Sequence, residues 1–230
     1  MGLFAFLSAA VSTAANFISG AVATIGTAIG GFAKSALNLI AGLPGMDLHN
    51  VISTVANIIH AVVEFLGINS EEEPEVLGAK AEQSDKSLED FDNDVEAYIK
   101  YLKEEVDLDK ERFDTLTPDE KLGCKAIGMA LETKAVEEKI GGVDIPPECL
   151  ATLAKIHASG IDIEAKELVT IIQALKEKGI TNLNDVVEYL EGTGQSDRLR
   201  TGEALDTALG EGAEDKIDKL KDAVRGFEEE

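Results

Sequence analysis

Cysteine and tryptophan are scarce in this chain. Its 230 residues include no tryptophan and only two cysteines, Cys124 and Cys149. Two cysteines outside a CxxC pair do not form a disulfide framework, so we expect reduced thiols and a fold that depends on its own core. Each cysteine lies among apolar positions of a predicted helix, where cysteine usually serves as a small core residue.

Catalytic and cofactor signatures are also missing. The sequence has no GxGxxG, P-loop, GxSxG or HExxH motif. Asp107, Asp109, Glu111 and Asp114 superficially resemble a calcium loop, but the turn glycine and the bidentate glutamate are absent at the required offsets. We therefore predict a protein that is not an enzyme, with no cofactor and no metal site.

Charge is almost absent from the first 70 residues, where only Lys34, Asp47 and Glu64 are charged. The rest of the chain carries nearly all of the net charge of −23. Such an acidic region is repelled by nucleic-acid phosphates and by anionic lipid, so no nucleic-acid partner is expected. Because no basic residue precedes Lys34, the apolar start does not match a cleavable secretory signal and is interpreted as part of the mature protein.

Large apolar residues recur every seven positions in the uncharged segment and predict one continuous helical stripe. The opposite face carries hydroxyl and amide side chains such as Ser12 and Asn16, and none is charged. A face without Lys, Glu or Arg suits close contact with lipid or protein better than contact with water. We predict that the stripe is a membrane or oligomer interface made by Phe4, Leu7, Val11, Ile18, Val22, Ile25, Ile29, Phe32 and Leu39.

Gly26 and Gly30 belong to the same predicted interface and allow two interpretations. Small residues spaced by four let helix backbones approach closely, which favours a glycine zipper. Glycine also weakens a helix by about 1 kcal/mol relative to alanine, which favours a flexible break. A straight helix over residues 3–41 would be about 58 Å long, whereas the apolar core of a bilayer is about 30 Å thick. The segment would therefore lie in the membrane interface, break near Gly26, or form a rod in an oligomer.

A second apolar helix is predicted to begin after the N-cap Asp47 and to end near Leu66, so that residues 1–68 form an apolar helical hairpin rich in alanine, glycine and serine. His49, His60 and Glu64 have a helical spacing that can bring metal ligands together. A histidine beside a carboxylate on a polar face is much more often structural, and that is the interpretation we prefer.

The remaining sequence predicts an all-α fold with an acidic multi-helix bundle. Residues 69–86 are expected to be an acidic linker, because a run of glutamates and Pro74 ends the apolar pattern. Residues 87–191 alternate capping signals with amphipathic stretches and are expected to form a soluble helical domain. Its helices are predicted over residues 87–103, from the capping box at Thr117 to about Ile140, after Asp144 to about Ser159, over residues 164–178, and from Asn182 or Asn184 to about Leu190. Residues 192–230 are rich in Gly, Asp and Glu and are expected to form a helical or flexible tail.

The composition of residues 1–68 resembles that of membrane-active proteins of phages, injection machines and pore-forming toxins. The likeness implies a self-assembling protein that inserts into or attaches to a membrane, with itself and a lipid membrane as partners. The alternative is a structural subunit of a filament, tube or particle, in which the N-terminal helices are buried between copies. The expected location is accordingly a membrane or an assembled particle.

Overall fold

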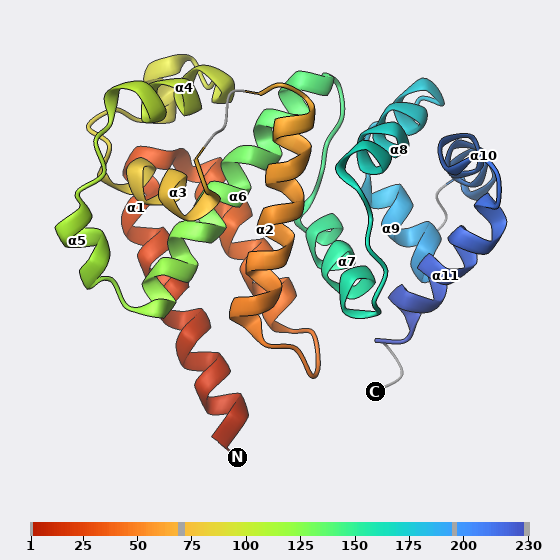
Figure 1. The fold of residues 1–230 in the computed structure, drawn as a ribbon, viewed down its shortest axis with the longest axis horizontal. Coiled ribbons are helices and arrows are strands. Elements are labelled where there is room, and N and C mark those ends of the chain that lie inside the picture. Colours follow the sequence, from red (N-terminus) through yellow and green to blue (C-terminus); the bar gives the residue numbers. More distant parts are fainter. Residues whose placement is uncertain (1, 69–71, 195–196, 228–230) are drawn as a thin grey trace.

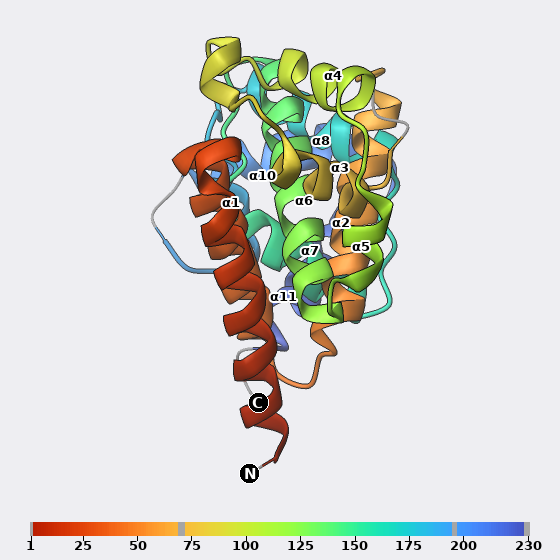
Figure 2. The same ribbon diagram turned by 90° about the vertical axis from the view of Figure 1, so that its left-hand side faces the viewer.

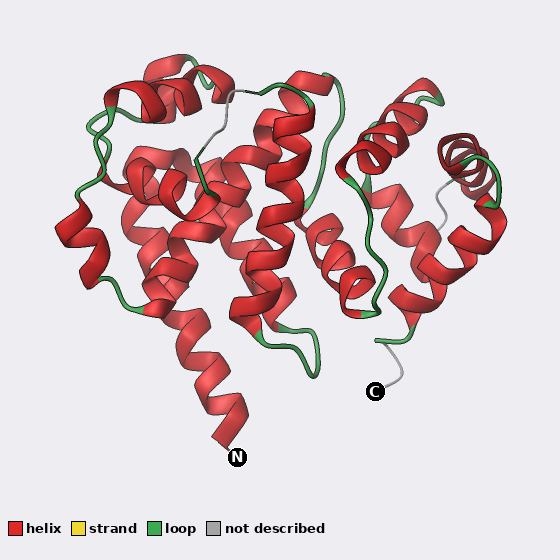
Figure 3. Cartoon of the chain, viewed as in Figure 1, coloured by secondary structure: helices red, strands yellow, loops and turns green. Residues whose placement is uncertain are grey.

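The computed structural model describes residues 2–68, 72–194 and 197–227. Within these residues the chain is helical and contains no strand, which confirms the predicted all-α class (Figure 3). The elements are α1 (Gly2–Ala41), α2 (Leu48–Phe65), α3 (Pro74–Gln83), the 3₁₀ helix η1 (Leu88–Phe91), α4 (Val95–Glu105), α5 (Lys110–Thr115), α6 (Pro118–Ile140), α7 (Pro147–Ala158), α8 (Ala165–Glu177), α9 (Asn184–Glu191), α10 (Arg198–Leu209) and α11 (Ala213–Arg225).

Helix α1 reverses its direction at Gly26, whose φ of 79° and ψ of 157° are open to glycine and strained for other residues. A methyl group added at Gly30 would lie 2.8 Å from Cγ2 of Val22 and 3.9 Å from Cγ2 of Ile18. In a straight helix residues eight apart are separated by about 12 Å along the axis, so this proximity requires the two segments of α1 to pack on each other. Of the three arrangements considered for this segment, the chain adopts the break.

Helix α6 occupies the centre of the molecule and packs against α1, α2, α3 and α4 (Figure 1). It begins at a capping box in which Thr117 and Glu120 exchange hydrogen bonds with each other's backbone. Most of its residues are buried, including Leu122, Ile127 and Leu131. Between Leu122 and Val136 nearly every position of α6 is buried, which requires neighbours all round this part of the helix and explains its central position.

Glycines bring α6 very close to two other helices. A methyl group at Gly78 of α3 would overlap the carbonyl oxygen of Cys124, and one at Gly128 would overlap that of Pro74. A methyl group at Gly123 would lie 3.1 Å from the carbonyl oxygen of Ala14 in α1. The closest helix packing in the chain therefore depends on α3 and α6, where the sequence analysis singled out no glycine.

Several elements differ from the sequence expectations. Residues 74–83, placed in the expected linker, form α3, because Pro74 occupies the first helical turn and Leu77 is completely buried. The helix expected from residue 87 is divided into η1 and α4 by Asp92 and Asn93, which have positive φ values. Helix α5 contains Glu111 and Asp114, two of the acidic residues for which a solvated helix face was the preferred interpretation over a calcium loop.

The last five helices pack against one another and against the central helices. Helix α10 contacts α8, and α11 contacts α9, α10 and α7. In the segment expected to be a helical or flexible tail, Leu205 and Val224 are buried. One main core, hereafter the main core, runs from α1 to α11, so the apolar N-terminal helices and the acidic helices share it. A smaller second cluster consists of Ile156, Leu190, Leu220 and Val224.

Candidate functional site

The N-terminal end of α1 projects beyond the rest of the molecule (Figure 2). Its backbone is helical from Gly2 onward. Of the predicted interface residues in this end, the side chains of Phe4 and Leu7 lie outside the described part of the structure, and Val11 is half-buried. Thus the first turns of a helix with no charged side chain before Lys34 extend from a strongly acidic protein.

Farther along α1, the predicted interface residues contribute to the chain's own core. Ile18, Ile25, Ile29 and Phe32 are buried, as is Gly30, because this side of α1 faces α6 and the returning segment of α1 itself. Val22 and Gly26 are partly buried, and Leu39 is 37% exposed. Between Ile18 and Phe32 the stripe is thus largely covered by the same chain, whereas the N-terminal end of α1 extends away from the body.

The exposed residues that the structure describes on the two segments of α1 carry no charge. Apart from Leu39 they are small or hydrogen-bonding, namely Ser8, Ala9, Ser12, Asn16, Ser19, Gly20, Ala23, Thr27, Ala28, Gly31, Ser35 and Asn38. We call this set the uncharged face. By length and composition alone, two described stretches, Ser8–Ala41 and Leu48–Phe65, are apolar enough to cross a membrane. Only 22% of the most apolar part of the first is buried within the chain.

Few polar contacts hold α1 to the body. The Tyr98 hydroxyl of α4 donates to the carbonyl oxygen of Thr24 at 3.2 Å. Burial raises the pKa of Tyr98 to about 12, which keeps the phenol protonated and able to donate at neutral pH. The ammonium group of Lys134 lies 4.9 Å from the centre of the Phe32 ring. Most of the attachment is therefore apolar packing, which is non-directional.

The two histidines of α2 have separate partners in α6. His49 Nε2 lies 3.1 Å from Asp119, whereas His60 Nδ1 lies 2.7 Å from Oε1 of Glu132. The Glu132 side chain is fully buried, and its hydrogen bond raises the pKa of His60 despite the opposing effect of burial. Glu64 is more distant, with Oε1 3.9 Å from His60 Nε2. The two histidines thus fix α2 on α6, which is the structural role that we preferred.

Metal and thiol chemistry find no support at these positions. Among the residues that the structure describes, no group of three or more His, Cys, Asp or Glu is arranged to hold a metal ion. Burial raises the pKa of the Cys124 thiol to about 12 and also raises the pKa of Cys149. A thiol with a raised pKa is a poor nucleophile at neutral pH.

Comparisons with known protein families, with curated proteins and with solved structures find no match to this chain.

Proposed function

We propose that this chain is a non-enzymatic, membrane-active protein that attaches to a lipid surface through the N-terminal end of α1. The observation that carries the proposal is a projecting helix end without any charged side chain on a protein with a net charge of −23. The first charged residue, Lys34, follows the reversal at Gly26. No charged side chain has to be desolvated when the projecting turns enter the interface, and each large apolar side chain that leaves water contributes about 1.5–3 kcal/mol.

Attachment by the projecting end leaves the rest of the fold intact. Deeper insertion of α1 would require Ile18 and Ile25 to leave the core and would expose the surface of α6 that they cover. Core residues of this size contribute several kcal/mol each, so the closed fold opposes insertion of the whole helix. Shallow attachment is therefore the state of lowest cost, and pore formation requires α1 to separate from α6.

The acidic body predicts which kind of lipid the chain should bind. Because like charges repel near a surface, the chain should prefer zwitterionic to anionic bilayers, and added salt should reduce the difference. A protein that binds membranes through basic residues would show the opposite preference.

Vesicle flotation of the full chain tests attachment. We expect the chain to float with phosphatidylcholine vesicles and to float less with vesicles that contain phosphatidylglycerol. Phe4→Asp combined with Leu7→Asp should reduce flotation at least tenfold, because charge in the apolar interface is costly. Gln173→Glu, an exposed change on α8 that also adds negative charge, should leave flotation unchanged. If the wild-type chain stays at the bottom with both lipids, or the double variant floats equally well, the proposal is wrong.

Self-assembly is the second candidate function, and the uncharged face favours it. Gly20 and Gly31 on this face have open space where a side chain would be, so the backbone of a second copy has room to approach closely. Light scattering after size-exclusion chromatography, without lipid, measures the oligomer directly. We expect Gly20→Leu with Gly31→Leu to dissociate it, and a wild-type monomer would rule this candidate out.

A further inference from the structure

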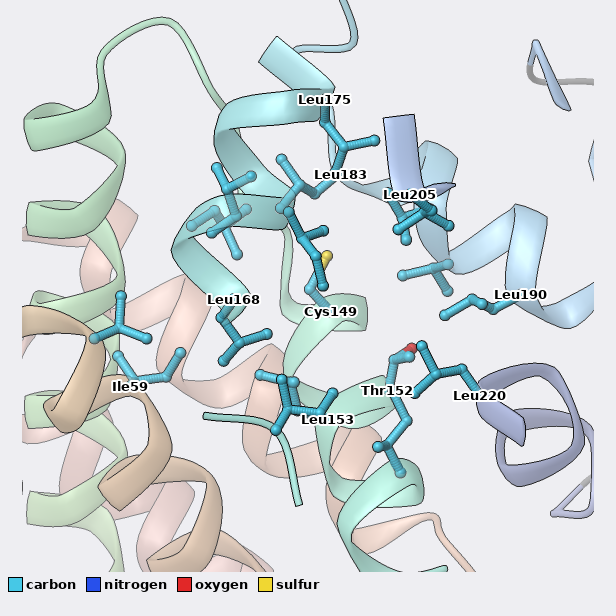
Figure 4. Close-up of a pocket in the computed structure, with 18 of the residues that line it drawn as sticks. Ile59, Cys149, Thr152, Leu153, Leu168, Leu175, Leu183, Leu190, Leu205 and Leu220 are labelled. Atoms are coloured by element: carbon cyan, nitrogen blue, oxygen red, sulfur yellow. The ribbon is translucent and has the colours of Figure 1, made fainter. Parts of the chain in front are cut away.

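An apolar cavity of about 100 Å³ lies where α7, α8, α9, α10 and α11 meet α2 and α6. Side chains from these helices converge on it, among them Ile59, Leu168, Leu175, Leu190, Leu205 and Leu220 (Figure 4). Protein interiors contain few voids larger than a water molecule, so a space of this size is uncommon.

The cavity separates the two groups of buried residues in this part of the molecule. Its wall includes Leu175 and Leu205 of the main core, and also Leu190 and Leu220 of the second cluster. Each group is packed within itself, and the space between them is left unfilled. The cavity is thus a feature of how α7–α11 are assembled and not of one missing side chain.

The lining defines the chemistry of an occupant. All lining side chains are hydrocarbon except Thr152 and Cys149, and none is charged. A water molecule needs two to four polar partners, which this wall does not provide, and a carboxylate or ammonium group inside would lose its hydration without compensation. An engineered cavity of about 150 Å³ with a similar lining stays dry and binds benzene or xenon.

From this lining and volume we propose that the cavity is a binding site for a short uncharged alkyl chain. The cavity is partly open to solvent, and because the lining residues Leu153 of α7, Ile163 of the following loop and Leu168 of α8 are only partly buried, we place its mouth beside them. A polar head group can stay in water at this mouth while the chain fills the cavity. This site is independent of the membrane attachment proposed for α1.

The test uses the full chain with its isoleucine, leucine and valine methyl groups labelled for NMR, and titrates 1-butanol, 1-pentanol and 1-hexanol without vesicles. We expect saturable shifts at Leu153, Leu168 and Leu190 and none at Ile25 or Ile52 in the region around α6. Affinity should rise about fourfold for each added methylene until the cavity is full. No saturable shift at the lining methyls, or equal shifts at Ile25 and Ile52, would overturn the proposal.

Variants that fill the cavity provide the control. Val187→Phe should abolish the chemical-shift changes. If this variant does not fold, Cys149→Leu, which adds volume at a different position of the cavity wall, should abolish them instead. Leu199→Ala removes a side chain that is 74% exposed and lies outside the cavity. This variant should leave alcohol binding unchanged, since it can alter only nonspecific adsorption of the alcohol to the protein surface. Binding that persists in a folded, filled variant would place the alcohols elsewhere and contradict the proposal.

A second titration distinguishes the source of the chain. Dihexanoyl phosphatidylcholine, kept below its micelle concentration, offers the same alkyl chain on a lipid head group. Shifts at the same methyls with both compounds identify an acyl chain of a lipid as an acceptable occupant. Shifts with 1-hexanol alone identify a small free molecule.

Discussion

The helices around α6 and the helices α7–α11 are packed in opposite ways. At the crossing of α3 and α6, added methyl groups at Gly78 and Gly128 would overlap backbone atoms. Between α7 and α11, by contrast, large aliphatic side chains leave about 100 Å³ unfilled. The crossing of α3 and α6 has no room for one more carbon atom, whereas the space among α7–α11 has room for several. The same chain therefore combines a rigidly specified half with an adaptable one.

The helix N-termini show the same contrast. Helices α2, α4, α5 and α6 each begin with a side chain that accepts a backbone N–H, for example Asp47 and Thr117. Helix α3, which begins after Glu73, has no such side-chain cap. Among α7–α11, Asp197 caps α10 and the side chain of Asn182 accepts from the first amide of α9, whereas α7, α8 and α11 have no side-chain cap. A missing cap leaves backbone donors to water and lowers the stability of a helix end by about 1 kcal/mol. Both packing and capping thus make α7–α11 the less constrained region.

The largest expected effect on stability is at the crossing of α3 and α6 where Gly78 and Gly128 lie, which we call the glycine crossing. Gly128→Ala should destabilise the chain by more than about 4 kcal/mol or prevent folding, because its methyl group has to displace the backbone of α3. Gly31→Ala is the matched control, since nothing lies within 4 Å of its added methyl group, and it should stabilise by about 1 kcal/mol. Urea unfolding followed by circular dichroism measures both. Equal free energies of unfolding for the two variants would contradict the close packing inferred at the glycine crossing.

The His60–Glu132 pair should give the region around α6 a distinctive pH dependence. The pKa of His60 is raised in the folded protein, so the protonated imidazole contributes to the free energy of unfolding. This contribution is complete below about pH 6.5, the pKa of a free histidine, and is lost as the pH rises through the pKa of His60 in the folded protein. His60→Gln should therefore cost about 1.5–3 kcal/mol at pH 6 and less at pH 9. His157→Gln, an exposed histidine of α7, is the control and should have little effect at either pH. If His60→Gln lowers the free energy of unfolding by the same amount at pH 6 and pH 9, the proposed role of the charged His60–Glu132 pair is wrong.

A new cap should stabilise the less constrained region. Glu164 occupies the N-cap position of α8 with extended backbone angles and makes no capping hydrogen bond, while Glu167 stands three residues later. Glu164→Ser creates a capping box and should raise the free energy of unfolding by about 1 kcal/mol. Hydrogen exchange of the first amides of α8 measures the local effect. Unchanged exchange rates of these amides would show that hydrogen bonds to water already serve them as well as the new cap does.

A slightly larger side chain should be accepted beside the cavity. Val187→Leu adds one methylene that has space available, and the expected stabilisation is about 0.8 kcal/mol. Thermal unfolding at a fixed protein concentration is sufficient to detect it. Destabilisation would mean that the wall of the cavity is as rigid as the glycine crossing.

Periodicity and capping signals predicted the helical class and the positions of α6, α8 and α9 closely, because these depend on local sequence. The division of α1 at Gly26 was one of three alternatives, since a glycine permits a reversal without requiring it. Gly78 and Gly128 were missed because a close crossing depends on two helices that are far apart in sequence. The cavity has no local signal at all, as its wall is assembled from α2 and from α6 to α11.

The predicted interface residues illustrate a further limit of sequence. A stripe such as Ile18, Ile25 and Phe32 looks the same whether lipid, another copy or the same chain covers it. The structure shows burial by the same chain for these three residues. Membrane attachment therefore remains a prediction that depends on the projecting end of α1.

The packing of α1 on α6 also has a consequence during protein synthesis. The first segment of α1 leaves the ribosome roughly 100 residues before α6 is complete, which at about 5–20 residues per second is a delay of roughly 5–20 seconds. During this interval the first segment of α1 lacks α6 and can pack only against earlier parts of the chain, such as the returning segment of α1. Any nearby bilayer or chaperone competes with α6 for it, so the rate of translation helps to decide whether α1 is folded inward or captured outside.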